Sequence, residues 1–127
     1  MWTYHQSTGQ LFDKTGKQIA TGYSGNGRGK NSPSMQAAQA VGPIPRGTWK
    51  MVEIYDSANV GPRAIKLDPV DEKPGNDRHE GTGRSAFRIH GDSIRNPGTA
   101  SHGCIILPRA VRLAMWASGD KLIEVVA

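Results

Sequence analysis

The sequence has 127 residues, a formal net charge of +5 at pH 7 and one cysteine. This length suits one compact domain over 1–127, and a single cysteine excludes an intramolecular disulfide framework. The basic residues are scattered, so the sequence predicts no basic stripe that would bind nucleic acid. It also has no run of 18 apolar residues, so no membrane insertion is predicted. The first ten residues lack the charged-then-apolar layout of a secretory signal.

The first half of the chain predicts short strands joined by turns, in keeping with 16 glycines and 8 prolines. Strands are expected at 2–5, 10–12, 18–20 and 48–55. The segment 22–34, rich in Gly, Asn and Ser, is expected to be a loop. Residues 35–40 are expected to form a short helix, and 42–47 a rigid turn fixed by two prolines.

The second half predicts further strands at 64–67, 86–90, 103–107 and 121–126. The polar segment 68–83 is expected to be a long loop. Helical spacing over 110–118 predicts a helix that opens at Pro108 and stops at Gly119. The chain is therefore expected to be mainly β, with one or two short helices.

The chemistry is concentrated around Cys104, which is preceded by His102 and Gly103 and lies 14 residues after His90. A thiolate is the nucleophilic form of cysteine, and a histidine can take its proton or hold an imidazolium beside the sulfur. His90 ends a predicted strand, and the loop 92–100 can return the chain alongside it. Gly103 permits a tight turn, so that the amides of Gly103 and Cys104 are expected to be oxyanion donors.

The motif Ser101-His102-Gly103-Cys104 with its upstream His90 resembles the signature of the L,D-transpeptidase (YkuD-like) catalytic domain. Gly22-Tyr23-Ser24-Gly25, Lys30-Asn31 and the turn 42–47 resemble the small branch that contains type VI secretion effectors. The resemblance implies an L,D-transpeptidase-like β-sandwich and a peptidoglycan-modifying cysteine enzyme that needs no cofactor. The activity that the resemblance implies is L,D-carboxypeptidase, L,D-transpeptidase or D-amino-acid exchange.

The resemblance also implies roles, partners and a place of action. Cys104 is the nucleophile and His90 the base, while His102, Gly103 and Ser101 complete the catalytic set. The substrate is a peptidoglycan peptide stem, and the protein is secreted to act in the periplasm of a target bacterium. An immunity protein and a component of the secretion apparatus are the expected protein partners.

The substrate-binding residues are less specific. The family usually carries Arg or Asn two residues after the cysteine, where this chain has Ile106, so Arg112 or Arg109 is expected to take that role. Arg46 and Arg88 are the next candidates. The remaining residues expected to line the cleft are Gly91, Tyr23, Ser24 and Asn31.

Other interpretations remain open on the residues alone. Cys104 precedes an apolar run and can be a buried thiol. A zinc site is a second alternative, with His79, His90, His102 and Cys104 as its ligands. Their spacing matches no common closed zinc site, so no metal is predicted. The alternatives to an effector are a housekeeping cell-wall cross-linker and a peptidoglycan-binding module without catalysis.

Overall fold

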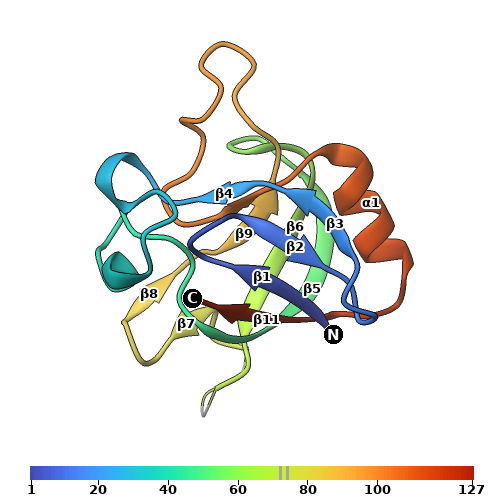
Figure 1. The fold of residues 1–127 in the computed structure, drawn as a ribbon, viewed down its shortest axis with the longest axis horizontal. Helices are drawn as coiled ribbons and strands as arrows, with labels where there is room; N and C mark the ends of the chain where they lie inside the picture. Colours follow the sequence, from blue (N-terminus) through green and yellow to red (C-terminus); the bar gives the residue numbers. More distant parts are fainter. Residues whose placement is uncertain (72, 74) are drawn as a thin grey trace.

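A computed structural model describes residues 1–71, 73 and 75–127, and it confirms a mainly β fold with one α-helix (Figure 1). The described strands are β1 (Trp2–His5), β2 (Gln10–Phe12), β3 (Gln18–Thr21), β4 (Tyr23–Ser24), β5 (Gly47–Ser57), β6 (Gly61–Pro69), β7 (Arg78–His79), β8 (Arg84–Ser85), β9 (Arg88–His90), β10 (Ile105–Ile106) and β11 (Leu122–Val126). The helix α1 spans Arg109–Ala117, and two 3₁₀ turns cover Gly27–Gly29 and Pro33–Met35.

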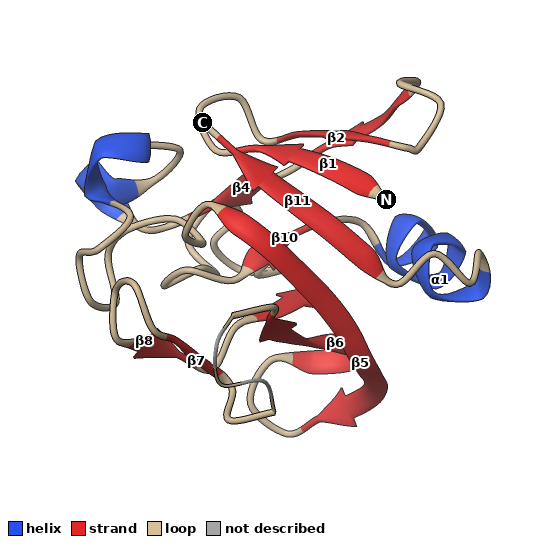
Figure 2. Ribbon diagram, turned by 90° about the horizontal axis from the view of Figure 1, so that it is seen from below, coloured by secondary structure: helices blue, strands red, loops and turns tan. Residues whose placement is uncertain are grey.

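Nine strands form one mixed sheet in the order β3-β2-β1-β11-β5-β6-β9-β10-β4, and β7 pairs with β8 separately. The two edge strands, β3 and β4, are consecutive in the chain and are separated by Gly22 alone. The two edges must therefore lie close together, so the sheet curls back on itself. Figure 2 shows how β5 runs from the layer of β1, β2 and β11 to the layer of β6.

The curled sheet encloses one apolar core. Alternate residues of each strand point to one face of a sheet, so each strand sends every second side chain inward. Ile89 of β9 and Ile105 of β10 lie in this core, with Trp49, Met51, Ile65 and Leu67 from the two long strands. The neighbouring residues of β9, Arg88 and His90, consequently point to the opposite face, where the candidate site lies.

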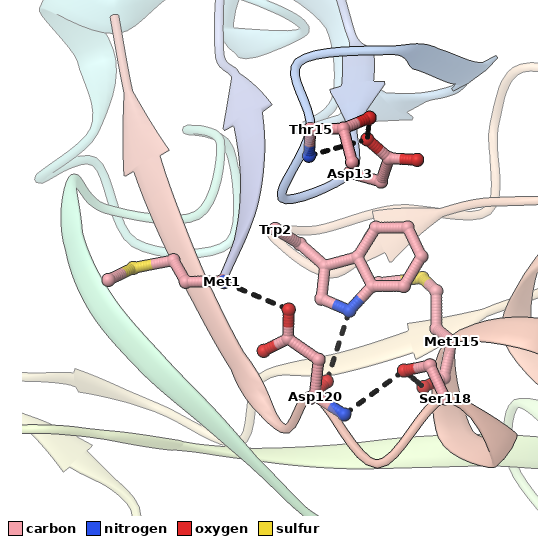
Figure 3. Close-up of polar contacts among 7 residues, drawn as sticks. All are labelled: Met1, Trp2, Asp13, Thr15, Met115, Ser118 and Asp120. Atoms are coloured by element: carbon pink, nitrogen blue, oxygen red, sulfur yellow. Dashed lines mark hydrogen bonds and ion pairs between the residues drawn. The ribbon is translucent and has the colours of Figure 1, made fainter.

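Helix α1 and the turn that follows it are fastened to the first strand (Figure 3). The helix ends as predicted, because Gly119 adopts a left-handed φ of 79° just beyond the C-cap residue Ser118. The carbonyl of Asp120 accepts a bond from Trp2 Nε1 at 3.0 Å, and its carboxylate lies 2.9 Å from the N-terminal ammonium of Met1. The turn therefore fixes where β11 begins beside β1.

Three segments differ from the sequence prediction. The expected loop 22–34 contains β4, which forms the sheet edge against β10. The expected helix over 35–40 is wrong, since this segment forms successive turns after the 3₁₀ turn Pro33–Met35. The carbonyl of Gln36 in this segment, and those of Gly42 and Pro43 just after it, accept hydrogen bonds from a distant arginine, Arg84. Within the expected loop 68–83, residues Arg78–His79 form a short strand, while Glu72 and Pro74 lie outside the described residues.

Candidate active site

Cys104 and His90 lie on adjacent parallel strands. The register of β9 with β10 pairs Ile89 with Ile105 and His90 with Ile106. Continued by one residue, it places Cys104 opposite Arg88, two positions before His90 along β9. Since Ile89 and Ile105 both face the core, Cys104, Arg88 and His90 share the other face. The fold thus places on one face the two residues that the motif spacing singled out.

The ring of His90 is held in one tautomer. Its Nδ1 lies 2.8 Å from the carbonyl oxygen of Gly91, and a carbonyl only accepts, so Nδ1 carries the hydrogen and Nε2 keeps its lone pair. The side chain is buried, and burial lowers the pKa of His90, with the Arg112 guanidinium adding to the shift. The Gly91 carbonyl and Asp92 oppose this shift only in part. His90 is therefore a neutral imidazole at pH 7, equipped to accept a proton at Nε2.

Cys104 lies in a wall of the site, with its Sγ 3.8 Å from the carbonyl oxygen of Ala86. Burial raises the pKa of the thiol, against the opposing effects of the Arg88 backbone N–H and of the Arg88 and Arg84 guanidinium groups. Ala86 itself has a left-handed φ of 67°, a conformation that costs a non-glycine residue free energy and is frequent at functional sites. The resting sulfur is therefore a thiol with cationic groups nearby.

The turn that presents Cys104 is folded around the hydroxyl of Ser101. Its Oγ donates to the carbonyl of Cys104 at 2.6 Å and accepts from the amides of Gly103 at 3.1 Å and Gly25 at 2.9 Å. These three bonds exhaust the capacity of a hydroxyl. The amide of Gly103 is therefore occupied, contrary to the expectation that it serves as an oxyanion donor, whereas the same expectation for Cys104 stands.

Arg84 is a site residue that sequence reasoning missed. It is 3% exposed, and its guanidinium donates to four carbonyl oxygens, those of Gln36, Pro43, Gly42 and His102, at 2.6–3.0 Å. It also lies 5.0 Å from the ring centre of Phe87. The side chain therefore ties the segment 36–43 to the turn that precedes Cys104. No sequence signal marks it, because all four acceptors are backbone groups.

A groove runs past Cys104 through three cavities that share residues. One of about 260 Å³ is lined by Arg84, His102 and Cys104, among others. A second, of about 190 Å³, shares Ala86 and Cys104 with it, and also has Tyr55, Ser57, Asn59, Val60 and Arg88 in its wall. The third, of about 250 Å³, shares Asn59 and Val60 with the second and reaches His90 beside the loop 92–100. In Figure 1 this loop (orange) stands above the sheet near the green turn between β5 and β6.

The two arginines expected to bind substrate do not line these three cavities. Arg112 is 3% exposed and donates to the carbonyls of Arg63, Leu107 and Pro62, so it joins α1 to β6 and to the end of β10. Arg109 lines a different cavity, together with Tyr23. Gly91 lies against Arg112, because a Cβ at this position would be 3.3 Å from its Nη1.

The other residues expected to line the cleft form hydrogen bonds that support the site. Ser24 is buried, with its Oγ donating to the carbonyl of Gly103 and accepting from the amide of Ile44, both at 2.8 Å. Asn31 accepts from the amide of Ser24 through its Oδ1. Tyr23 donates to Asp92 Oδ1 at 2.5 Å and accepts from the amide of Ala100 at 2.9 Å. Tyr23 thus fixes both ends of the loop 92–100.

His102 is exposed at the rim of the cavity that holds Cys104, with Nδ1 3.2 Å from the carbonyl of Ala40. His79 stacks on Trp49 with ring centres 5.6 Å apart. Among the described residues, no three His, Cys, Asp or Glu side chains gather in a group that suits a metal ion. In the same residues, no helix is long and apolar enough to cross a membrane.

Comparison with known proteins gives a family and a fold. The family model of the Tlde1 domain matches residues 18–124. A search of curated protein sequences found no match. Among solved structures, an L,D-transpeptidase (Yku) from Stackebrandtia nassauensis is similar, with a TM-score of 0.53 and 16% sequence identity. The likeness covers 99% of this chain and 54% of that one, so the chain spans about half the length of that protein.

Proposed function

This chain belongs to the Tlde1 domain family and has an L,D-transpeptidase-like fold, and from that premise we propose that it is a peptidoglycan-modifying cysteine enzyme acting through Cys104. One observation carries the proposal. His90 and Cys104 share one face of neighbouring parallel strands, and the bond from His90 Nδ1 to Gly91 leaves Nε2 available as a base. The substrate is the tetrapeptide stem of peptidoglycan.

The acylation step follows from the neutral state of both groups. Nε2 of His90 accepts the thiol proton as Sγ of Cys104 attacks the carbonyl at the L-centre of diaminopimelate. The amide N–H of Cys104 is the donor we assign to the resulting oxyanion. Breakdown of the tetrahedral intermediate breaks the peptide bond. The His90 imidazolium protonates the departing D-alanine amine, leaving a thioester on Cys104.

The acyl-enzyme is resolved by the acceptor that reaches it. Attack by water releases a tripeptide stem and gives L,D-carboxypeptidase activity, whereas attack by an amine gives a cross-link or exchanges the terminal D-amino acid. In each case, His90 removes a proton from the acceptor and returns it to the sulfur. The groove is open at the exposed His102, which leaves room for a large acceptor such as a second stem.

Mass spectrometry of muropeptides after incubation with the protein tests this function. The wild-type protein is expected to convert tetrapeptide stems to tripeptides or to exchanged and cross-linked products. Cys104→Ala removes the nucleophile with a small loss of volume, and is expected to fold and to give none of these products. Trimming by the Cys104→Ala variant at the wild-type rate would refute the mechanism.

The place of action is part of the proposal. As an effector, the protein acts in the periplasm of a target bacterium, because cross-linked peptidoglycan lies there. Expression in the cytoplasm is expected to be harmless, and expression behind a signal peptide to be toxic. The Cys104→Ala variant serves as the control in both compartments. Equal toxicity of the wild-type protein in both would indicate a cytoplasmic target.

A further inference from the structure

Of the arginines around the groove, Arg88 has hydrogen-bonding capacity left for a ligand. The two terminal nitrogens of Arg84 each donate to two carbonyls. Arg112 is buried, and its guanidinium already donates to three carbonyls. Arg88 donates from Nε to Tyr55 Oη at 2.6 Å and from Nη1 to the carbonyl of Phe87 at 3.0 Å. Within the described part of the chain, its Nη2 makes no hydrogen bond. The side chain lines the same cavity as Cys104.

The geometry points to Arg88 as the residue that binds the carboxylate of the leaving D-amino acid, in the part of the groove that it forms with Tyr55 and Cys104. The inference rests on the proposed function and specifies its substrate. It also answers a chemical need, because a stem that ends in D-alanine carries a terminal carboxylate next to the bond that breaks. A planar guanidinium can bond both oxygens of a carboxylate.

The position of Arg88 relative to His90 favours the leaving group over the acyl part. His90 must reach the departing amine to protonate it, and in an α-amino acid a single carbon separates this amine from the carboxylate. Arg88 and His90 lie two residues apart on one face of β9. The cavity of Arg88 joins that of His90 through Asn59 and Val60. An amino acid with its amine at His90 therefore directs its carboxylate toward Arg88.

Two neighbours keep Arg88 ready for an anion. Tyr55 fixes the Nε side of the guanidinium by its hydrogen bond. The Asp77 carboxylate approaches Nη1 only to 4.0 Å, and its Oδ1 is buried without a hydrogen-bond partner in the described residues. A pair at this distance is weaker than a direct hydrogen-bonded pair. A substrate carboxylate can therefore compete successfully with Asp77 for the guanidinium.

The test uses two small reagents that alkylate the same sulfur. Iodoacetate carries a carboxylate and iodoacetamide is its neutral counterpart, so the ratio of their rates at Cys104 cancels changes in thiol reactivity. Arg88→Gln is expected to lower this ratio about tenfold, in keeping with the loss of a charged hydrogen bond. Asp77→Asn removes a competing anion and is expected to raise it. Asn also tolerates the left-handed φ of 64° at this position.

Arg28→Gln is the matched control, because it removes the same charge from an exposed turn and is expected to leave the ratio unchanged. An unchanged ratio in Arg88→Gln, with iodoacetamide still alkylating Cys104, would overturn the inference. Arg88→Lys keeps a cation and provides a second variant should the glutamine protein fail to fold. It is expected to lower the ratio by a smaller factor.

Matched tetrapeptides identify the carboxylate. The wild-type protein is expected to prefer a stem that ends in D-alanine over one that ends in D-alaninamide, and Arg88→Lys to lose most of this preference. A preference that follows amidation of the diaminopimelate side chain instead would overturn the assignment to the leaving amino acid. If the wild-type protein cleaves neither peptide, the proposed function fails, while the reagent ratio still decides whether Arg88 binds a carboxylate.

Discussion

Cys104 is surrounded by effects that act on its thiol in opposite directions. Burial raises its pKa, whereas the Arg88 amide and the two guanidinium groups of Arg88 and Arg84 lower it, and burial prevails. His90 is neutral for the same physical reason, since burial disfavours its charged form. The two groups thus rest uncharged, and in the proposed mechanism the proton moves to His90 only as the sulfur attacks.

The resting state can be read from the pH dependence of alkylation. The rate of Cys104 with iodoacetamide is expected to rise with pH through a midpoint above the value of about 8.5 for a free cysteine. His90→Gln is expected to leave this midpoint nearly unchanged, because a neutral imidazole contributes no charge. The same variant is expected to reduce stem cleavage by about 100-fold or more, since it removes the base. A midpoint near pH 6–7 that shifts upward in His90→Gln would indicate a preformed ion pair instead.

Gly103 is required for steric reasons as well as for its backbone conformation. Its φ is 145°, and a Cβ there would lie 2.5 Å from Arg84 Nη2 and 2.8 Å from Phe87 Cε1. Gly47 offers a matched control, with a φ of 131° and no atom within 4 Å of the place that a Cβ would occupy. Gly103→Ala is expected to lower the free energy of unfolding by about 2–3 kcal/mol, and Gly47→Ala by about 1 kcal/mol. Chemical denaturation measures both, and equal losses would show that the contact with Arg84 is unimportant.

At the scale of the elements, the site depends on two long-range connections made by polar side chains. Arg84 of β8 holds the segment 36–43 against the turn before Cys104. Tyr23 of β4 holds the loop 92–100 through Asp92 and Ala100. Burial and its hydrogen bond to Asp92 raise the pKa of Tyr23 to about 12, so this connection persists at neutral pH. Both walls of the groove are thereby positioned by residues that need not touch the substrate.

The role of Arg84 can be tested with a variant that keeps the positive charge but loses the planar guanidinium. Arg84→Lys retains a cation near Cys104, yet one ammonium cannot reach four carbonyls that a planar guanidinium spans. It is expected to lower kcat/KM for stem cleavage at least tenfold and the free energy of unfolding by about 2 kcal/mol. Arg28→Lys is the matched surface control. Normal kcat/KM in Arg84→Lys, measured on purified folded protein, would show that the connection does not position the nucleophile.

The elements that the sequence predicted well are those with a local signal. Turn residues between short segments marked β1, β2 and β5, and a glycine marked the end of α1. The segment 35–40 has good helix formers but forms turns, and one of its carbonyls, that of Gln36, accepts a hydrogen bond from Arg84, 48 residues away. Strand β4 was missed since its two residues gain their extended form from pairing with β10. Propensity cannot register either of these distant partners.

The residues of the candidate site also differ in whether a local sequence signal marks them. Cys104 and His90 could be singled out because a motif carries them, and the strand register places both on one face. Their catalytic roles stay a prediction. The sequence could not identify Arg84 as a site residue. It also could not show that Ser24 and Asn31 form supporting hydrogen bonds instead of lining the cleft. Their position depends on backbone contacts between segments far apart in the sequence. The sequence spacing of Arg109 and Arg112 also could not reveal that α1 packs against β6 and β9, with neither arginine in the cavities that Cys104 lines.

At the scale of the whole molecule, the buried groups of the site link stability to pH. The curled sheet withdraws His90 and Cys104 from water while both are uncharged. The folded-state pKa of His90 is lowered, so below about pH 6.5 the unfolded chain binds more protons than the folded one. The pKa of Cys104 is raised, so above about pH 8.5 the unfolded chain has released a proton that the folded one keeps. Both groups therefore stabilise the fold most between these two limits.

The last prediction follows from the signs of these two shifts. The free energy of unfolding, measured by chemical denaturation from pH 5 to pH 10, is expected to be highest near neutrality and to fall toward both ends. The slope contributed by one proton cannot exceed about 1.4 kcal/mol per pH unit. His90→Gln is expected to flatten the decline below pH 6.5 and leave the alkaline side unchanged. Cys104→Ala is expected to flatten the decline that begins near pH 8.5, while the steeper loss above about pH 10 remains, because burial also raises the pKa of Tyr4 in the core. If both variants kept the full wild-type curve, His90 and Cys104 would have to ionise in the folded protein as they do in the unfolded chain, and the neutral resting pair would be wrong.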